Sequence, residues 1–230
     1  MATDATHRAF KDRLYGEFAR IGKAVANPHR LEILELLAQG ERTVESIAGE
    51  TSLSMANASQ HLQALRAAGL VDARKVGLFV HYRLADEGVF ELSRVVRAVA
   101  ERRLAELDRL VREHFGDRDA AKPVGMQELL ARVRAGDVVL LDTRPASEYA
   151  AGHISGAISA PVDELERVLS RLPKRKEYVA YCRGPYCIYA DRAVELLRKR
   201  GRSARRMVEG FPEWKAAGFP VERPLAAEGG

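Results

Sequence analysis

The chain has 230 residues, of which 47% are hydrophobic, so it is long enough to form two packed domains. The N-terminal segment MATDATHRAFKDRLYGEF lacks the apolar stretch of a secretory signal, and no apolar run approaches the ~18 residues of a membrane span, so we expect a cytoplasmic protein without a membrane partner. The formal net charge of +5 arises within residues 121–230, so bulk charge gives no indication of DNA binding by the first half.

The first 115 residues are predicted to be mostly helical. Phe10, Leu14 and Phe18 recur at four-residue spacing, which indicates the apolar stripe of a helix. Further helices are predicted in NPHRLEILELLAQGE, in TVESIAGE with Thr43 as N-cap, and in SLSMANASQHLQALRAAGL, which begins at a serine cap and ends at Gly69.

A hairpin and a long helix are predicted to follow. LVDARKVGLFVHYRL alternates up to Gly77, and the β-branched and aromatic residues after it favour a second strand. From Glu87 to Phe115 the apolar residues follow one helical pattern, which would extend about 40 Å. Because a small domain cannot cover such a helix, we expect it to pack against the same helix of a second copy in a homodimer.

Short helices followed by a basic hairpin predict a winged helix-turn-helix. The second helix of such a unit enters the major groove, where hydroxyl and amide side chains bond base edges. The predicted base-contacting residues are Ser54, Asn57, Ser59 and Gln60. Arg74 and Lys75 of the hairpin would contact phosphates, which orient the protein on operator DNA without reading its sequence.

The segment ANPHRLEILELLAQGERTVESIAGETSLSMANASQHLQALRAAGLVDARKVGLFVHYRLAD closely resembles the ArsR/SmtB family of bacterial repressors, and the resemblance covers residues 8–115. It implies a homodimer that binds an operator and is released by a signal. Many metal sensors of this family carry a cysteine pair on the helix that reads RTVESIAGE here, which has none, and the last helix offers only His114. We therefore expect neither a metal ion nor a cofactor. A winged helix used only for protein contacts stays open as an alternative.

The second half has the pattern of an α/β domain. GDRDAAKPVG, residues 116–125, is predicted to be a linker. Beyond it the apolar strands DVVLLD, YVAYC and SARRMVE alternate with the helices VDELERVLSRL and ADRAVELLRKRG, which predicts a parallel sheet covered on both faces. The expected fold is thus multidomain: a mainly α winged helix-turn-helix over residues 1–115, followed by an α/β domain with a parallel sheet over residues 126–224.

Both cysteines of the chain lie five positions apart in YCRGPYCIYADRA. Cys182 follows a strand, at the carboxyl end where parallel sheets place their sites. Backbone N–H groups of the following loop and the N-terminus of the next helix form an anion cradle, which lowers the pKa of the Cys182 thiol. The loop residues between the two cysteines are Arg183, Gly184, Pro185 and Tyr186. In a reducing compartment, such a pair is predicted to be reactive or ligating rather than structural.

Residues 123–224 resemble the rhodanese homology domain. LLDTRPASEYAAGHISGAISAP matches its first motif and MVEGFPEW its last, with Glu209 where a glycine is common. The resemblance implies that Cys182 is the catalytic cysteine and carries a persulfide. It also implies that Asp142 and Arg144 lie near the loop, as structural or active-site partners.

By resemblance, the length of the loop that follows the catalytic cysteine distinguishes rhodaneses from the related phosphatases. Single-domain rhodaneses place a closing arginine at the position of Cys187, and dual-specificity phosphatases place it at the position of Ile188. We therefore expect no phosphatase activity and only weak turnover of thiosulfate, a dianion. Cys187 is then either a second, resolving thiol that attacks sulfur held on Cys182 or a small buried hydrophobic residue at a helix start.

The sequence predicts a DNA-binding transcriptional repressor whose rhodanese-like domain senses a small sulfur-containing or oxidising effector through Cys182 and Cys187. Two alternatives remain open. The chain could be a weak rhodanese-type sulfurtransferase, working through a Cys182 persulfide, with an attached DNA-binding domain. It could also be a sensor of oxidants or arsenite, because two thiolates hold a soft ion.

Overall fold

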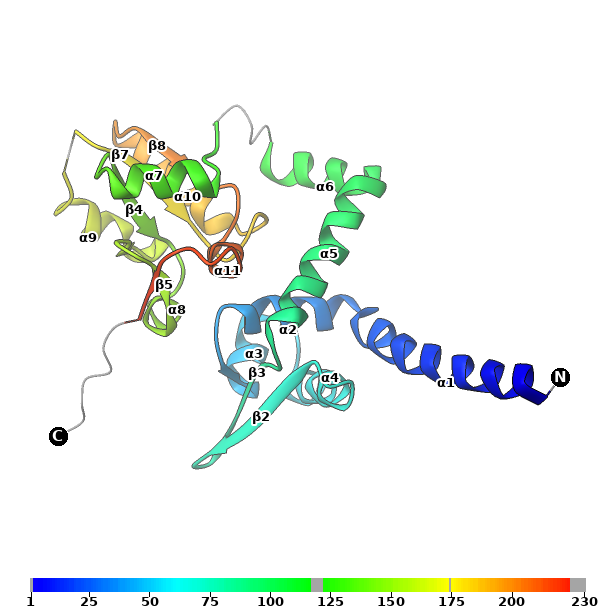
Figure 1. The fold of residues 1–230 in the computed structure, drawn as a ribbon. Helices are drawn as coiled ribbons and strands as arrows, with labels where there is room; N and C mark the ends of the chain where they lie inside the picture. The colour runs from blue at the N-terminus through cyan, green and yellow to red at the C-terminus, as the bar shows by residue number, and fades with distance from the viewer. Residues whose placement is uncertain (1, 117–121, 174, 224–230) are drawn as a thin grey trace. The chain divides into compact units, whose positions relative to one another are not determined.

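The computed structural model describes residues 2–116, 122–173 and 175–223. Two compact units divide the chain, Met1–Ala98 and Val99–Gly230. Each is described separately below, and the ribbon of Figure 1 follows the chain through both. Of the predicted linker 116–125, residues 117–121 lie outside the described residues. No helix within the described ranges combines the length and hydrophobicity needed to cross a membrane.

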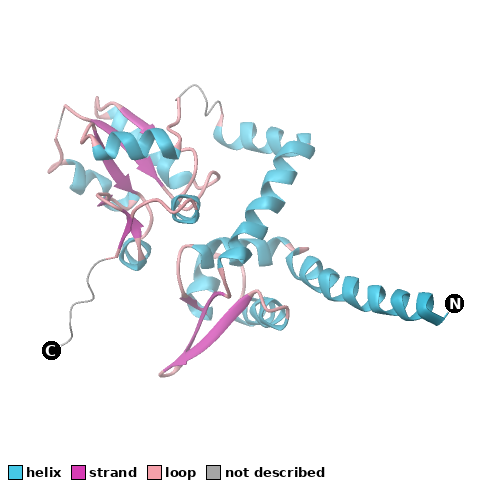
Figure 2. Cartoon of the chain, viewed as in Figure 1, coloured by secondary structure: helices cyan, strands magenta, loops and turns pink. Residues whose placement is uncertain are grey.

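The first unit is a winged helix-turn-helix. Its elements are α1 (Ala2–Val25), α2 (Pro28–Ala38), β1 (Arg42–Thr43), α3 (Val44–Glu50), α4 (Met55–Ala67), β2 (Val71–Val76), β3 (Phe79–Leu84) and the first part of α5 (Glu87–Arg103). The three strands form an antiparallel sheet in the order β1-β3-β2. Figure 2 shows β2 and β3 as a hairpin that extends beyond the helices of this unit.

Side-chain caps set the starts of the helices in this unit. Asn27 accepts the Arg30 N–H at the start of α2, and Thr43 accepts the Ser46 N–H at the start of α3, as the sequence predicts for Thr43. After the C-terminal end of α4, Gly69 has a positive φ of 75°, which glycine adopts without steric cost.

The core of the first unit forms where these helices meet the sheet. Fully buried side chains from α2, α3, α4 and β2 fill it, namely Ile33, Leu34, Leu37, Ile47, Ala58, Leu62, Leu65 and Val71. By contrast, Phe10 and Phe18 of α1 remain 58% and 60% exposed. The apolar stripe predicted for this helix therefore exists, but this chain alone does not cover it.

The prediction of one continuous helix from Glu87 to Phe115 is wrong, because the helix is interrupted at Leu104. Leu104 has an extended backbone (φ −110°, ψ 96°), so α5 ends at Arg103 and α6 (Ala105–Phe115) begins after it. Arg102 and Arg103 stand at the negative end of the α5 dipole, and Glu106 lies in the first turn of α6, at its positive end. Each helix therefore has its own favourable terminal charges on either side of Leu104.

The second unit is a parallel α/β domain. After α6 its elements are α7 (Met126–Arg134), β4 (Val138–Asp142), α8 (Ala146–Ala151), β5 (His153–Ile154), β6 (Ile158–Ser159), the 3-10 helix η2 (Val162–Glu164), α9 (Leu165–Leu169), β7 (Glu177–Tyr181), α10 (Ile188–Lys199), β8 (Ala204–Arg206), α11 (Phe211–Ala216) and β9 (Val221–Glu222). The main sheet has the order β6-β4-β7-β8, and its paired strands are parallel.

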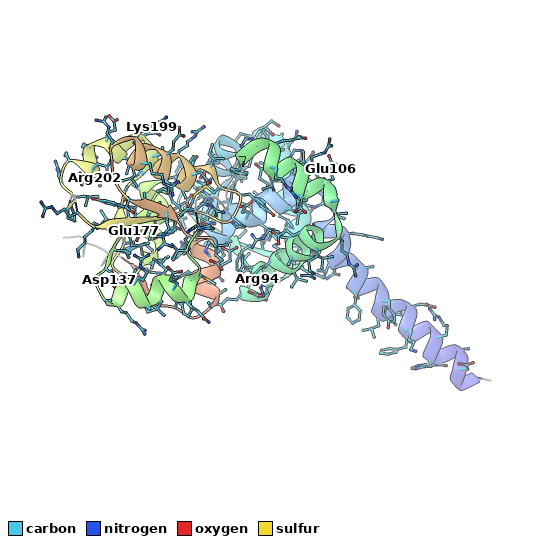
Figure 3. The ribbon with its side chains drawn as sticks, turned by 90° about the horizontal axis from the view of Figure 1, so that it is seen from above. Arg94, Glu106, Asp137, Glu177, Lys199 and Arg202 are labelled. Carbon is cyan, nitrogen blue, oxygen red and sulfur yellow. A yellow bond between two sulfur atoms is a disulfide. The ribbon has the colours of Figure 1, made fainter. Side chains whose placement is uncertain are left out.

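Both faces of this sheet are buried, as predicted. Neighbouring residues of one strand point to opposite faces, so Tyr178 joins the core beneath α9 and α10, whereas Val179 joins the core beneath α7 and α11. Ion pairs add to this packing at the start of β7, where Glu177, labelled in Figure 3, lies 2.6 Å from Arg132 of α7 and 2.5 Å from Arg205 of β8. Burial raises the pKa of Glu177, but the hydrogen bonds from the two arginines outweigh it and hold that pKa below its usual value.

Candidate DNA-binding surface and cysteine loop

The α4 helix presents one buried and one exposed face. Ala58, Leu62 and Leu65 are fully buried, whereas Asn57 and Gln60 are exposed on the other side of the helix. This is the arrangement that a recognition helix requires, because its exposed side chains must reach base edges.

The two serines that are predicted to contact bases are less available for such contacts than Asn57 and Gln60. Ser54 is exposed, but its Oγ accepts the Asn57 N–H at 3.2 Å and so caps the helix. Ser59 is half-buried. Asn57 and Gln60 are therefore the better placed of the four predicted side chains.

Arg74 and Lys75 of the wing are both exposed on β2, but Arg74 forms an ion pair with Glu41. The carboxylate of Glu41 accepts from Arg74 Nε at 3.0 Å, and His81 Nδ1 lies 3.1 Å from the same carboxylate. Lys75 stands next to Arg74, opposite Val80 of β3. Arg74 is exposed whereas Glu41 is only partly exposed, and a surface ion pair typically contributes about 1 kcal/mol or less, so a phosphate can compete with Glu41 for Arg74.

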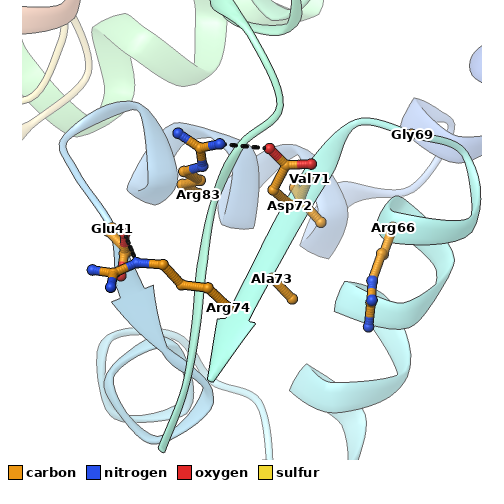
Figure 4. A pocket seen from close by; sticks show the side chains of 8 residues that line it. All are labelled: Glu41, Arg66, Gly69, Val71, Asp72, Ala73, Arg74 and Arg83. Carbon is orange, nitrogen blue, oxygen red and sulfur yellow. Dashed lines mark hydrogen bonds and ion pairs between the residues drawn. The ribbon is translucent and has the colours of Figure 1, made fainter. Parts of the chain in front are cut away.

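A surface pocket of about 450 Å³ lies between the wing and the end of α4 (Figure 4). Its lining consists of Glu41, Arg66, Gly69, Val71, Asp72, Ala73, Arg74 and Arg83. Arg83 is hydrogen-bonded to Asp72 at 2.9 Å, and Arg66 reaches the pocket from α4. Three guanidinium groups thus surround a pocket that has two carboxylates, which leaves a net positive lining next to the recognition helix.

The structure brings the two cysteines together. Cys182 follows the last residue of β7 and is only 2% exposed, and Cys187 is the N-cap of α10. They form a disulfide, with Cα atoms 6.2 Å apart. The loop between them curls back on itself, because the Cys187 N–H donates to the Gly184 carbonyl at 3.2 Å.

The segment around Gly210 packs directly against the backbone of the cysteine loop. A Cβ on Gly210 would lie 2.4 Å from Arg183 C and from Gly184 N, so only a glycine permits this close approach. The next residue, Phe211, donates its N–H to the Cys182 carbonyl at 3.0 Å. MVEGFPEW matches a family motif, but its sequence does not predict this contact, for which the glycine is the local signal.

The arginine of the loop is neutralised by a buried carboxylate. Arg183 Nε donates to Glu148 Oε1 of α8 at 2.9 Å, and the Glu148 side chain is almost fully buried. This pair ties α8 to the loop. The guanidinium of Arg183 therefore has a protein carboxylate as its partner, and sequence reasoning could not assign that partner.

Asp142 and Arg144 lie beside the end of β7, the strand that precedes Cys182, in a network of buried hydrogen bonds. Both side chains are 0% exposed, and Arg144 Nη2 donates to Asp142 Oδ2 at 2.6 Å and to the Gly152 carbonyl at 2.8 Å. The hydroxyl of Tyr181 donates to the same Asp142 oxygen at 2.6 Å and accepts the Ile154 N–H. Burial first, and then the charge of Asp142, raises the pKa of Tyr181 well above its ordinary value. These contacts link Asp142 and Arg144 to Tyr181, the residue that precedes Cys182.

Among the described residues, no group of three or more His, Cys, Asp and Glu side chains is placed to hold a metal ion. Two imidazoles, those of His29 in α2 and His61 in α4, have ring centroids 5.5 Å apart. A pair of ligands falls short of the four donors that zinc normally takes.

Comparisons with known proteins agree with this architecture. The family model described as bacterial regulatory protein, arsR family, matches residues 27–73, and the rhodanese-like domain model matches residues 125–217. The HTH-type transcriptional regulator Rv0324 of Mycobacterium tuberculosis H37Rv is 46% identical over 212 residues, which covers 92% of this chain and 93% of that protein. The chain belongs to the ArsR family. It carries a rhodanese-like domain after its winged helix-turn-helix.

Other relatives of this ArsR-family chain match one half only. The HTH-type regulator CmtR of Mycobacterium tuberculosis H37Rv is 41% identical over 35% of this chain and 72% of its own length. A solution structure titled homodimeric winged helix-turn-helix DNA-binding domain of Mb0332 from Mycobacterium bovis is 49% identical over 42% of this chain and 89% of its own, with a TM-score of 0.40. A rhodanese-related protein from Thermoplasma volcanium is 25% identical over 44% of this chain and 96% of its own, with a TM-score of 0.39.

Proposed function

We propose that this ArsR-family chain is a homodimeric, cytoplasmic repressor that binds operator DNA and is released when its rhodanese-like domain reacts with sulfane sulfur. Cys182 is the reacting thiol, and Cys187 resolves the product. The observation that carries the proposal is the pairing of these two cysteines across one short loop, with Cα atoms 6.2 Å apart.

The DNA-binding half of the proposal rests on α4 and the wing. Asn57 and Gln60 stand exposed at the start of α4, and the β2–β3 hairpin adds Arg74 and Lys75 beside it. Amide side chains bond adenine edges, and basic side chains bond phosphates. The homodimer rests on the apolar stripe of α1, whose Phe10 and Phe18 are more than half exposed in the single chain.

The sensing half is a two-step reaction. First, the Cys182 thiolate attacks the terminal sulfur of a small persulfide, RS–SH, which forms Cys182–S–SH and releases the thiolate RS⁻. Second, the Cys187 thiolate attacks Sγ of Cys182, which forms the Cys182–Cys187 disulfide and releases HS⁻. The persulfide is thereby reduced to a thiol and sulfide, and the two cysteines are oxidised.

The electrostatics of the loop favour a donor of low charge over thiosulfate. Arg183 is paired with the buried carboxylate of Glu148, and Cys187 occupies the position at which a closing arginine would hold a dianion. The remaining attraction comes from the backbone of the loop and the start of α10 at Ile188, which suits a single negative charge.

The release of DNA requires that the disulfide state binds the operator more weakly than the dithiol state. Because Cys187 is the N-cap of α10, closing the bridge acts on the first turn of that helix. A coupling of 1–3 kcal/mol between the two sites corresponds to a change of about 5- to 150-fold in operator affinity.

The test is operator affinity of the full-length protein in the reduced, persulfide-treated and peroxide-treated states, with mass spectrometry of each sample. We expect persulfide to produce the Cys182–Cys187 disulfide and to weaken binding at least about 5-fold. Release by peroxide but not by persulfide would assign the signal to oxidants instead.

Two cysteine variants distinguish the proposed repressor function from the alternative of a sulfurtransferase. The Cys187→Ser protein should still accept sulfur on Cys182 and yet remain on DNA, whereas the Cys182→Ser protein should accept none. If Cys187→Ser releases DNA as the parent does, Cys187 has only a packing role. If neither treatment changes DNA affinity while Cys182 passes sulfur to thiols catalytically, the alternative of a sulfurtransferase is correct.

A further inference from the structure

The tip of the wing is apolar and exposed. Val76 pairs with Phe79 in the register of the hairpin, and Gly77 and Leu78 form the turn between them. Gly77 has a φ of 60°, so the turn depends on glycine at this position. Leu78 is 93% exposed, Phe79 53% and Val76 43%, which leaves an apolar patch at the end of a hairpin that projects beyond the helices of its unit (Figure 1).

The apolar tip continues the outer face of the wing. In an antiparallel hairpin, residues opposite each other point to the same face, and successive residues alternate. Val71 and Tyr82 are buried in the core, so the face that holds Val76 and Phe79 is the opposite one, which also carries Arg74. Apolar and basic side chains therefore lie in sequence along one outward surface of the hairpin.

Charge around the tip identifies its partner as a polyanion. The hairpin carries Arg74, Lys75 and Arg83, of which Arg83 is hydrogen-bonded to Asp72 and Arg74 to Glu41, so the cations exceed the carboxylates by one. Arg74 and Arg83 line the pocket that Arg66 of α4 also lines, and α4 is the helix that we propose for the major groove, so the tip lies on the same hairpin as part of the proposed DNA-binding surface. A short basic element that ends in leucine and phenylalanine matches the wedges that minor-groove proteins insert between base pairs, which kink the duplex by roughly 20–90°.

We propose that Leu78, at the tip of the wing, partly separates two stacked base pairs from the minor-groove side of the bound operator, so that the repressor bends its DNA. Phe79 and Val76 would cover the sugar edges on either side. The inference rests on the proposed DNA binding and adds a contact that deforms the DNA. It predicts a preference for a flexible pyrimidine–purine step beneath each wing, since such steps unstack at the lowest cost.

The test uses the full-length reduced protein and a duplex that it selects from a random library. The bend is measured by energy transfer between labelled duplex ends, and unstacking by the fluorescence of 2-aminopurine placed at the step beneath the wing. Leu78→Ser should fold normally because the side chain is exposed. We expect it to bind roughly 10-fold more weakly, with a smaller bend and without the fluorescence rise.

Two control variants make the result specific. Lys75→Ala should lower the salt dependence of binding by about one phosphate contact and leave the bend unchanged. Val221→Ser changes an exposed valine of the second unit and should alter neither measurement.

Equal bend, fluorescence and affinity for Leu78→Ser and the parent would overturn the wedge while leaving the proposed repressor intact. A change of oligomeric state on Leu78→Ser, with the DNA unbent by the parent, would assign the tip to contact with a second copy. If the parent selects no DNA at all, the proposed function itself fails, and the wedge fails with it.

Discussion

Replacing Gly210 by alanine should disturb the cysteine loop without touching either thiol. Gly210 has an extended backbone with φ −116°, which alanine adopts freely, so the change adds no backbone strain and acts mainly through the steric clash. Its new Cβ would lie 2.4 Å from Arg183 C, whereas ordinary van der Waals contact begins at 3.4 Å. The loop backbone must therefore move by about 1 Å, and overpacking of this kind typically costs 1–3 kcal/mol.

The shift acts on both stability and reactivity. A loss of about 2 kcal/mol should lower the Tm of the rhodanese-like domain by roughly 10 °C. Moving the loop also strains the hydrogen bond from the Phe211 N–H to the Cys182 carbonyl, so the rate at which Cys182 accepts sulfur should fall. Operator binding by the reduced protein should stay unchanged, because Gly210 belongs to the second unit.

The assays are thermal unfolding and pulse alkylation of Cys182 after reduction. Gly125→Ala is the matched control, since no atom lies within 4 Å of a Cβ at that position in the same unit. If Gly210→Ala keeps both the Tm and the alkylation rate of the parent, the tight contact is not what holds the loop, and this reasoning is refuted.

Four other variants have defined expected outcomes. Arg74→Ala should weaken binding to all DNA sequences and reduce the salt slope by about 1, whereas Glu41→Gln should strengthen binding, because a carboxylate that competes with phosphate is removed; titrations at several salt concentrations measure both. Gln60→Ala should change base preference at particular operator positions, which selection from a random library reveals, and an unchanged consensus would exclude a base contact. Burial raises the pKa of Glu209, whose Oε2 has no hydrogen-bond partner among the described residues, so the folded state binds its proton more tightly than the unfolded state. Stability is then lost as pH rises through that raised pKa, and Glu209→Gln should raise the Tm at pH 7 by an amount that shrinks as pH falls towards 4.

The sequence by itself determined the features that depend on neighbours along the chain. Thr43 and Ser54 cap helices because their side chains reach an N–H group three residues later. Gly77 permits the turn of the wing, and the uninterrupted apolar strands around Leu140 and Val179 require cover on both faces. These local rules, together with the motifs of two families, were enough to predict both domains and the parallel sheet.

The apolar periodicity gave a wrong prediction at one point of the first half, the break between α5 and α6. Apolar periodicity continues through Leu104, so it predicts one helix across that residue. The break depends on the backbone conformation of a single residue, which periodicity does not encode. The exposed stripe on α1 was predicted as a helix face, but only the tertiary structure shows that this chain leaves it uncovered.

Only the tertiary structure decided which distant residues meet at the cysteine loop. Glu148 pairs with Arg183 across 35 positions, and Asp142 meets Tyr181 across 39, because parallel strands bring their carboxyl ends to one edge of the sheet. Gly210 reaches the loop from beyond the last strand of that sheet. Contacts of this kind depend on strand order and register, and these are properties of the packed chain rather than of any one segment of it.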